Sequence, residues 1–477
     1  MTSMTLPTGQ KITYGYSNFG GVSQGSNNNQ AVSRWLTSKS SSTGTWNYSP
    51  VVTAGWGPSN TCLSGWQVGC MQATVTKPDG SKDIDAFIVD PFGGSWAQTI
   101  QSYDTNGTTL LSTVINNWTI GYTVGSVPCE LVSCREATVY YGHPVGYEDV
   151  ELGSSLTTRP TPGGGNITEQ SVFTWAVGPQ TGLPASIQEW GYRNGTASTA
   201  TFPAVPDRAT YLTYAAISGN PSIINRVATK TVCNNVTSSP ADPYCPAGAT
   251  TVARTTTTYD AYDSNGSSGL EPPAGVGSIQ NQDGTGHGTG YTARGNPTQI
   301  SNWVSGSTYL TTALSYDTTG QVIASRDPNL NYTYYYYSDD FSFDDGENPP
   351  PTFTPTNPTN AYLTIISDNI GLTHAGYYYG SGHLAWTWDY NYVPTYFHYI
   401  DPFDRPTETN YAIGWSLNTY TSPTEVDSYS AIGDTTASAS CVSCSHTQAL
   451  LDTLGRVTSQ SLVNNPSGKS YETASYD

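Results

Sequence analysis

The sequence predicts an all-β protein, with tandem hairpins joined in a twisted antiparallel sheet. A short module, in which an aromatic or aliphatic residue precedes Asp-x-x-Gly, recurs along the chain, and its clearest copy is Tyr316–Val322. Segments between the modules alternate with the period of two that a strand requires, whereas no window shows the 3.6-residue period of a helix. Aspartate can bond the backbone two residues on, and glycine accepts a positive φ. Each module is therefore expected at the end of a hairpin.

The first region, residues 1–250, carries degenerate copies of the module. A loose copy stands near the start at Tyr16–Val22, and isolated copies begin at Tyr103 and, just past this region, at Tyr262. The last two contain Asn-Gly, which is a strong hairpin signal. A polar stretch, Asn234–Gly248, then marks a soft boundary near residue 250, which we interpret as a change in the regularity of the repeats.

The second region, residues 251–477, is more regular. Ile400–Pro406 and Leu451–Val457 follow the plan of the clearest copy. In Leu310–Tyr316 every second residue shares one face, as a strand requires. The segment Asn331–Tyr337 has tyrosines on both faces, which suits a strand packed on one side and lined by aromatic hydroxyls on the other.

Two insertions interrupt the second region. Residues 339–358 are acidic and then proline-rich, so a long exposed loop is expected near this position. Ser264–Gly290 is polar and rich in glycine, and we expect it to form an irregular connection as well.

Together the modules resemble the YD-repeat, or Rhs-repeat, family, whose pattern is Tyr-Asp-x-x-Gly-Arg-hydrophobic, then Pro-x-Gly, then Thr-x-Tyr-x-Tyr-Asp. Equivalent positions lie 21 residues apart from Tyr316 to Tyr337, 22 apart from Tyr378 to Ile400, and 25 apart from Leu451 to Tyr476. Residues 295–477 carry most of this resemblance.

The resemblance implies a spiral β-shell with a structural, non-enzymatic role: it encloses a toxin or acts as a cell-surface interaction module. The implied partners are further YD repeats of the same chain, an encapsulated C-terminal toxin, or a cell-surface glycan or protein. Toxin-releasing members end their repeats in a self-cleaving core motif, which Asp327-Pro328 and Asp401-Pro402 do not reproduce. Neither autoproteolysis nor toxin activity is therefore assigned. The chain ends on the module opening Tyr476-Asp477, so we expect it to be a fragment of a longer chain.

Composition excludes several functions. The net charge is 17 − 36 = −19, which disfavours a nucleic-acid groove and docking on an anionic membrane. Only 11% of residues are charged, but 12% are aromatic, which favours an ordered β chain over disorder. We find no apolar run that reaches the ~18 residues of a membrane helix. The polar start, Met1–Met4, is no signal peptide, and we expect a secreted or cell-surface protein whose N-terminal signal lies upstream.

Cysteine usage supports that location. The eight cysteines form four close pairs, which suits disulfides in an oxidising compartment: Cys62 with Cys70, Cys129 with Cys134, Cys233 with Cys245, and Cys441 with Cys444. The pairing rests on proximity, because sequence alone does not fix connectivity. A zinc site at Cys441, Cys444 and His446 is the less favoured alternative, since three ligands fall short of the four of a structural site.

Other metal or cofactor sites are weaker still. An acidic cluster could offer calcium its preferred oxygen ligands: Asp339, Asp340, Asp344, Asp345 and Glu347. Its spacing does not match an EF-hand, and a solvated linker is the favoured interpretation. His287 lies in a glycine-rich stretch without the lysine and helix of a phosphate loop. We predict no catalytic, cofactor-binding or metal-binding residue.

A secreted carbohydrate-binding or glycoside-cleaving β protein is the alternative function. Two carboxylates across a cleft suffice for a glycosidase, and Trp386–Tyr390 could provide aromatic platforms for sugars. With 36 acidic residues, however, suggestive carboxylate pairs are expected by chance. Trp386 and Trp388 share a strand face, and we expect them to pack in the core. The scaffold is therefore preferred over an enzyme.

Overall fold

The computed structural model of the chain describes most of its residues. The described ranges are 2–6, 11–20, 32–54, 69–89, 95–120, 123–124, 127–128, 150–176, 182–235, 244–264, 266–274, 279–344, 346–434, 436–440, 443–452, 454–464 and 470–475. Within them the chain is all-β, without a helix, as the sequence predicted. Several residues singled out in the sequence lie outside these ranges, namely Cys62, Cys129, Cys134, Asp345, Cys441, Tyr476 and Asp477.

The first half of the chain supplies strands up to β16. They are β1 (Ser3–Thr5), β2 (Lys11–Gly20), β3 (Val32–Ser41), β4 (Gly44–Ala54), β5 (Gly69–Thr76), β6 (Lys82–Val89), β7 (Ser95–Tyr103), β8 (Leu110–Ile120), β9 (Thr123–Val124), β10 (Val127–Pro128), β11 (Val150–Pro160), β12 (Asn166–Trp175), β13 (Pro184–Asn194), β14 (Arg208–Tyr214), β15 (Val227–Asn235) and β16 (Ala249–Tyr259).

The second half supplies shorter strands. They are β17 (Pro297–Ser305), β18 (Thr308–Tyr316), β19 (Val322–Arg326), β20 (Tyr332–Tyr336), β21 (Phe341–Ser342), β22 (Thr352–Phe353), β23 (Ile365–Ser367), β24 (Leu372–Tyr378), β25 (Leu384–Trp388), β26 (Pro394–His398), β27 (Glu408–Tyr411), β28 (Gly414–Ser422), β29 (Glu425–Ile432), β30 (Ser445–Leu451), β31 (Val457–Leu462) and β32 (Ser470–Thr473).

One 30-stranded sheet contains all of these strands except β9 and β10, which pair with each other. Neighbours in the sheet are neighbours in the sequence and run antiparallel, apart from two places where the sheet skips strands: β8 pairs with β11, and β20 pairs with β23. The small hairpin β21–β22 joins the sheet through a parallel pairing of β21 with β24. The sheet continues through residue 250, because β16 pairs with both β15 and β17. The boundary proposed there stays a prediction.

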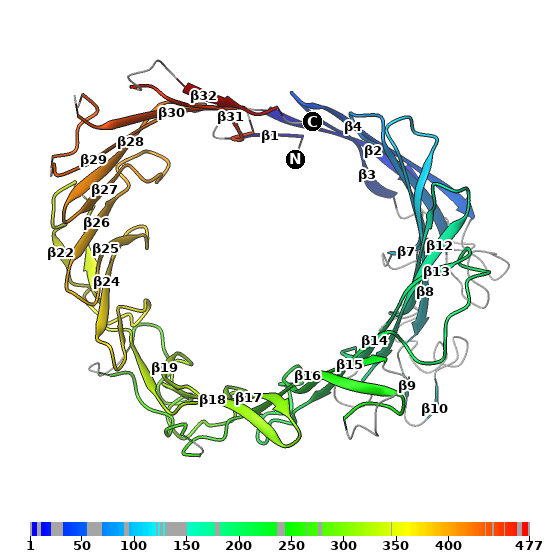
Figure 1. The fold of residues 1–477 in the computed structure, drawn as a ribbon, viewed down its shortest axis with the longest axis horizontal. Helices are drawn as coiled ribbons and strands as arrows, with labels where there is room; N and C mark the ends of the chain where they lie inside the picture. Colours follow the sequence, from blue (N-terminus) through cyan, green and yellow to red (C-terminus); the bar gives the residue numbers. More distant parts are fainter. Residues whose placement is uncertain are drawn as a thin grey trace.

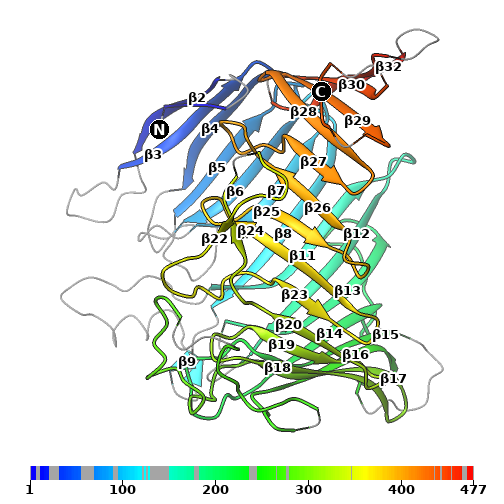
Figure 2. The same cartoon turned by 90° about the vertical axis from the view of Figure 1, so that its left-hand side faces the viewer.

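The sheet winds into a ring. Figure 1 shows the strands following one another around a central space that no drawn segment crosses. The two ends of the chain meet in this view, but Figure 2 shows them displaced along the ring axis, and the strands inclined to it. Within the described residues no pairing joins β32 to β1. The accumulated twist of the strands therefore yields an open, spiral-like turn.

The wall of this ring is one sheet thick. Its accessible surface is 26442 Å², about one and a half times the ~17,000 Å² that a compact monomer of 477 residues would expose. Burial is correspondingly mixed: Trp415 and Ala385 are fully buried, but so are Thr168 and Thr298. The two buried threonines are hydrogen-bonded: the Thr168 hydroxyl donates to the Gly195 carbonyl at 2.7 Å, and the Thr298 hydroxyl accepts from the Ala261 amide at 3.1 Å.

The three clear modules close hairpins, as predicted, whereas the loose copy that begins at Tyr16 does not, because Tyr16–Gly20 lies inside β2. Tyr316–Val322 connects β18 to β19, Leu451–Val457 connects β30 to β31, and Ile400–Pro406 connects β26 to β27. In the first of these the amide of Gly320 donates to the Asp317 carbonyl at 3.1 Å, and Gly320 has a φ of +90°. This is the left-handed conformation that glycine adopts without steric cost.

Two expectations about packing need correction. Trp388 is 37% exposed and Trp386 is only half-buried, so these indoles do not lie in a core; the fully buried residue of this strand is Ala385, next to Trp386. A wall one sheet thick has no second layer to cover them. The segment 339–358 is exposed at Glu347, but it also folds as β21–β22, with Phe341 buried.

Candidate functional site

Strand ends along one part of the ring are fastened by tyrosine hydroxyls. From β14 to β20, every second strand has a tyrosine as its last residue or directly after it, and this tyrosine donates to the carbonyl of the first residue of the preceding strand. The pairs are Tyr214 to Pro184 at 2.7 Å, Tyr259 to Val227 at 2.9 Å, Tyr316 to Pro297 at 2.9 Å, and Tyr337 to Val322 at 3.0 Å. Burial, with the nearby Asp260 carboxylate, raises the pKa of Tyr316 to about 12. These hydroxyls therefore join neighbouring strands within the wall.

The module aspartates are engaged in the same structural role. The Asp317 side chain is 1% exposed. One carboxylate oxygen accepts from the Thr319 amide at 2.9 Å, the Thr319 hydroxyl at 2.6 Å and the Gln321 amide at 3.1 Å. The other oxygen accepts from the Asn360 amide group at 3.3 Å. A carboxylate so fully engaged is a structural turn residue, as the module predicted.

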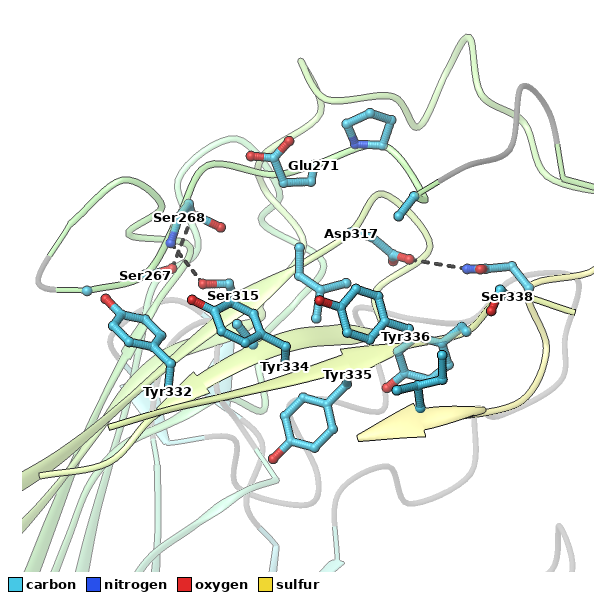
Figure 3. Close-up of a pocket in the computed structure, with 18 residues that line it drawn as sticks. Ser267, Ser268, Glu271, Ser315, Asp317, Tyr332, Tyr334, Tyr335, Tyr336 and Ser338 are labelled. Atoms are coloured by element: carbon cyan, nitrogen blue, oxygen red, sulfur yellow. Dashed lines mark hydrogen bonds between the residues drawn. The ribbon is translucent and has the colours of Figure 1, made fainter. Parts of the chain in front are cut away.

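A cavity of about 800 Å³ opens beside this module (Figure 3). Its floor is β20, whose tyrosines Tyr332, Tyr334 and Tyr336 project to the same side, while Tyr335 projects to the other. The rings of Tyr332 and Tyr334 stack with centroids 5.8 Å apart and an interplanar angle of 11°. The three side chains are 38%, 44% and 41% exposed, so their rings and hydroxyls face the cavity rather than a core.

The opposite wall of the cavity is the segment from Ser267 to Glu271. The Ser268 amide donates to the Ser315 hydroxyl at 2.9 Å, and the Glu271 amide donates to the Tyr316 carbonyl at 3.1 Å. The Thr318 amide returns a bond to the Glu271 carbonyl at 2.8 Å. These bonds fix the segment over the strand ends and leave the Glu271 side chain exposed at the mouth. The cavity therefore combines aromatic rings, hydroxyls and one open carboxylate.

A second polar cluster attaches the proline-rich segment to the sheet. His398 is 1% exposed; its Nδ1 lies 2.9 Å from an Asp344 carboxylate oxygen, and its Nε2 lies 2.9 Å from the Asn348 side-chain oxygen. The Tyr378 hydroxyl lies 3.1 Å from the same Nδ1, and the second Asp344 oxygen accepts from the Tyr399 amide at 2.7 Å. Because each of these groups is engaged, the cluster fastens the segment onto β24 and β26.

Three carboxylates of the acidic cluster considered for calcium bind separate partners. Asp344 binds His398, Asp340 lies 3.0 Å from His374, and Asp339 accepts from Thr359 and Asn360. Within the described residues no group of three potential metal ligands comes together. The solvated-linker interpretation also needs correction, because these three carboxylates bind neighbouring elements.

One predicted disulfide is confirmed, and a second bonded cysteine bears on the zinc hypothesis. Cys233 and Cys245 are bonded, with their Cα atoms 5.9 Å apart. Cys444 is disulfide-bonded too, which removes its thiolate as a zinc ligand. His446 binds the Asp427 carboxylate at 2.8 Å instead. The pairings of Cys62 with Cys70, of Cys129 with Cys134 and of Cys441 with Cys444 each involve a residue outside the described ranges and stay predictions.

The cavity was not predicted as a site. His287, considered for phosphate, lies edge-on to Tyr291 with ring centroids 5.0 Å apart, and its Nδ1 lies 3.6 Å from an Asp283 carboxylate oxygen. The tyrosines of Asn331–Tyr337 could have indicated the cavity in the sequence. A strand with tyrosines on both faces is expected to leave one of those faces open. Nothing in the sequence indicated that Glu271 belongs to the cavity, because its position depends on how its loop folds over β20. No helix in the described part of the chain is long and apolar enough to span a membrane.

Comparison with solved structures shows a remote likeness. No family model matches the chain, and no curated protein matches it. A TcdB2–TccC3 structure without its hypervariable C-terminal region aligns over 97% of this chain and 27% of that one, with 9% identity and a TM-score of 0.24. The Tc holotoxin pore of Photorhabdus luminescens aligns over 98% and 22%, with 10% identity and a TM-score of 0.27. A TcdB2–TccC3–Cdc42 complex aligns over 99% and 26%, with 9% identity and a TM-score of 0.24. This chain thus spans about a quarter of those chains, and scores this low define neither a family nor a function.

Proposed function

We propose that this chain is a structural scaffold: a section of an Rhs-type β-shell that encloses a toxin segment or acts as a cell-surface interaction module. The observation that carries the proposal is the single-layer sheet wound around a central space, with about one and a half times the surface of a compact monomer. A wall with two exposed faces is costly unless something occupies at least one of them, because exposed surface gives up burial that would stabilise a compact fold.

The construction of the wall supports this role. Tyrosine hydroxyls fasten strand ends, and the Asp317 carboxylate is taken up by its own turn. The confirmed disulfide between Cys233 and Cys245 suits a protein that works outside the reducing cytoplasm. We therefore propose a secreted or cell-surface protein that performs no reaction, whose partners are further repeats of its own chain and a guest or a surface ligand.

Small-angle scattering and electron microscopy of the full chain test the shell. A hollow wall should give the scattering minima of a shell and a ring in projection, and a compact sphere of the same mass would refute it. Enclosure needs a second experiment, in which the gene is read beyond this chain and any following segment is included. Protease protection of that segment within the assembled protein supports enclosure, whereas rapid digestion supports the surface role.

A carbohydrate-related role is the second candidate, because the exposure of Trp388 removes the main argument against a sugar platform. Cleavage is not expected of this chain. A reducing-sugar assay on a panel of polysaccharides should stay at background, and release of sugar that is lost in a carboxylate variant would overturn the non-enzymatic assignment.

A further inference from the structure

We propose that an aromatic strip on one face of the second half of the sheet binds a neutral oligosaccharide. The strip crosses β20, β24 and β25 and consists of Tyr332, Tyr334, Tyr336, His374, Trp386 and Trp388. The site does not depend on the shell function, because a wall can bind a glycan whether or not it encloses another segment.

Strand register places these side chains on the same face. Tyr336 lies opposite Ile365 of β23, and Ile365 lies opposite His374 of β24. His374 in turn lies opposite Trp388 of β25. Residues directly opposite one another in antiparallel strands project to the same side. Three strand spacings separate β20 from β25, so the strip extends roughly 14 Å across the sheet.

The tryptophan end of the strip is a platform. Gly376 lies opposite Trp386, and a Cβ atom at Gly376 would collide with several indole atoms of that tryptophan. The indole therefore lies against the backbone of a residue without a side chain, which turns its other ring face away from the sheet. The ring of Trp388 follows at 5.2 Å with a tilt of 39°, and this side chain is 37% exposed. Exposed aromatic faces of this kind stack on the apolar C–H faces of sugar rings.

His374 connects the two parts of the strip and is held in place. Its Nε2 lies 3.0 Å from an Asp340 carboxylate oxygen. Its ring contacts both indoles edge-on, at 4.8 Å for Trp386 and 5.4 Å for Trp388. A ring fixed by a carboxylate and two aromatic neighbours does not need to be ordered by the ligand, which lowers the entropic cost of binding.

The tyrosine end of the strip is the cavity described above. Tyr336 and Ile365 line it, so its end borders His374. Its volume of about 800 Å³ falls in the range of small-molecule sites. Tyrosine hydroxyls line one side and Ser267, Ser268 and Glu271 the other. Such a cavity suits a ligand that has many hydroxyl groups and apolar faces, and the end of a glycan chain has both.

The charges around the strip favour a neutral ligand. Asp317 and Asp389 are each engaged by their own turns, and Asp340 is paired with His374. Among the described carboxylates that line the cavity, this leaves Glu271 open. Arg326 stacks over Tyr332 at 6.0 Å, and a single stacked guanidinium is a poor site for a phosphorylated polymer. A lysine- or arginine-rich peptide would need several open carboxylates, so a glycan fits the strip better.

The test is a glycan array probed with the full chain, followed by titration of neutral glucose and N-acetylglucosamine hexasaccharides with tryptophan fluorescence. Binding should be retained in 0.5 M salt, because no charge pairing is involved. Trp388→Ala and Gly376→Ala should each weaken it tenfold or more, the second by displacing the Trp386 indole. Trp388→Phe should keep most of the affinity.

Tyr411→Ala is the matched control. Tyr411 is 49% exposed, and because it lies opposite Thr395 it projects to the other face of the sheet from Tyr396 and the strip. Its loss should leave glycan binding unchanged. Absence of binding to every neutral glycan overturns the proposal, as does binding of an oligolysine probe that disappears in 0.5 M salt and in Glu271→Gln. Scattering from the same samples reports separately whether the shell is formed, so the two proposals fail independently.

Discussion

The modules at Asp317 and Asp452 make the same turn with different partners. In both, the aspartate accepts from amides two and four residues on, at 2.9 and 3.1 Å in the first and 2.8 and 2.9 Å in the second. The remaining oxygen accepts from the neutral Asn360 in the buried module, but from the guanidinium of Arg456, at 2.7 Å, in the less buried one. The turn thus requires a hydrogen-bond acceptor at the aspartate position. The burial of that aspartate determines how much the free energy of unfolding falls when the acceptor is removed.

The largest expected loss of stability distinguishes the two aspartates. Asp317→Ala should lower the free energy of unfolding by roughly 3 kcal/mol, because buried donors of Thr319, Gln321 and Asn360 lose their acceptor. Asp452→Ala should cost clearly less, since water can reach the freed groups at a side chain that is 20% exposed.

Urea denaturation followed by tryptophan fluorescence measures both values. Asp317→Asn keeps one oxygen acceptor and is expected to fall between wild type and Asp317→Ala. Equal losses at the two aspartates would show that burial does not distinguish the modules.

A smaller effect comes from the residue before each aspartate. Tyr316 donates its hydroxyl to the Pro297 carbonyl, whereas the equivalent Leu451 has no hydroxyl to donate. Tyr316→Phe should cost about 1–2 kcal/mol, because a carbonyl beside a buried ring loses its donor. Leu451→Met, which changes shape without removing a hydrogen bond, should cost less than about 1 kcal/mol.

The tyrosine also gives a pH signature. Its pKa is raised to about 12 in the folded protein, so the folded state holds the proton more tightly than the unfolded chain, whose tyrosines titrate near ~10. This contribution to stability is complete below about pH 10 and is lost as the pH rises towards 12. The stability difference between wild type and Tyr316→Phe should therefore shrink over that interval. A difference that stays constant from about pH 9 to pH 12 would contradict the assignment.

The residue three positions after the aspartate is glycine in some turns and another residue in others. Gly320 has a φ of +90°, and no atom lies within 4 Å of the place that a Cβ would take, so Gly320→Ala should cost about 1 kcal/mol through backbone conformation alone. Leu330 occupies the same place in the turn after Asp327, at a φ of +70°, and is 65% exposed. Leu330→Gly should therefore stabilise by about 0.5 kcal/mol. Thermal unfolding of the two variants checks that their shifts have opposite signs.

The turns could be predicted from the sequence because their chemistry is local. Asp317 and Gly320 carry the hairpin within a few residues, and so does Asp452. The winding of the sheet could not be read in this way, since it results from small twists added over many strands. The cavity was missed because Ser268 and Tyr334 are 66 residues apart in the chain. The burial expected of Trp388 is wrong because it assumes that the strand face meets a second layer, which this wall lacks.

The smallest effect is expected at the module that ends β26, where Asp401 binds Arg405 through two bonds of 2.6 and 2.8 Å. The hydrogen bonds from Arg405 lower the pKa of Asp401 to about 2. A carboxylate whose pKa is lowered in the folded state stabilises the fold at pH values above its unfolded pKa, near ~3.9. That contribution is lost as the pH falls towards 2.

Arg405 also stacks on Tyr420 at 3.7 Å, but its side chain is 32% exposed. The Asp401 side chain is itself only 7% exposed, but it keeps a hydrogen bond from the Phe403 amide at 2.8 Å when Arg405 is removed. Because water reaches the guanidinium and screens the pair, Arg405→Ala should cost less than about 1 kcal/mol at neutral pH. The Asp401 carboxyl should then titrate closer to its ordinary value in an NMR experiment. Arg405→Ala could instead lower the free energy of unfolding as much as Asp317→Ala does. The guanidinium would then be as important to its turn as the buried hydrogen bonds are to theirs, and the difference in exposure would not explain why the same turn tolerates different partners.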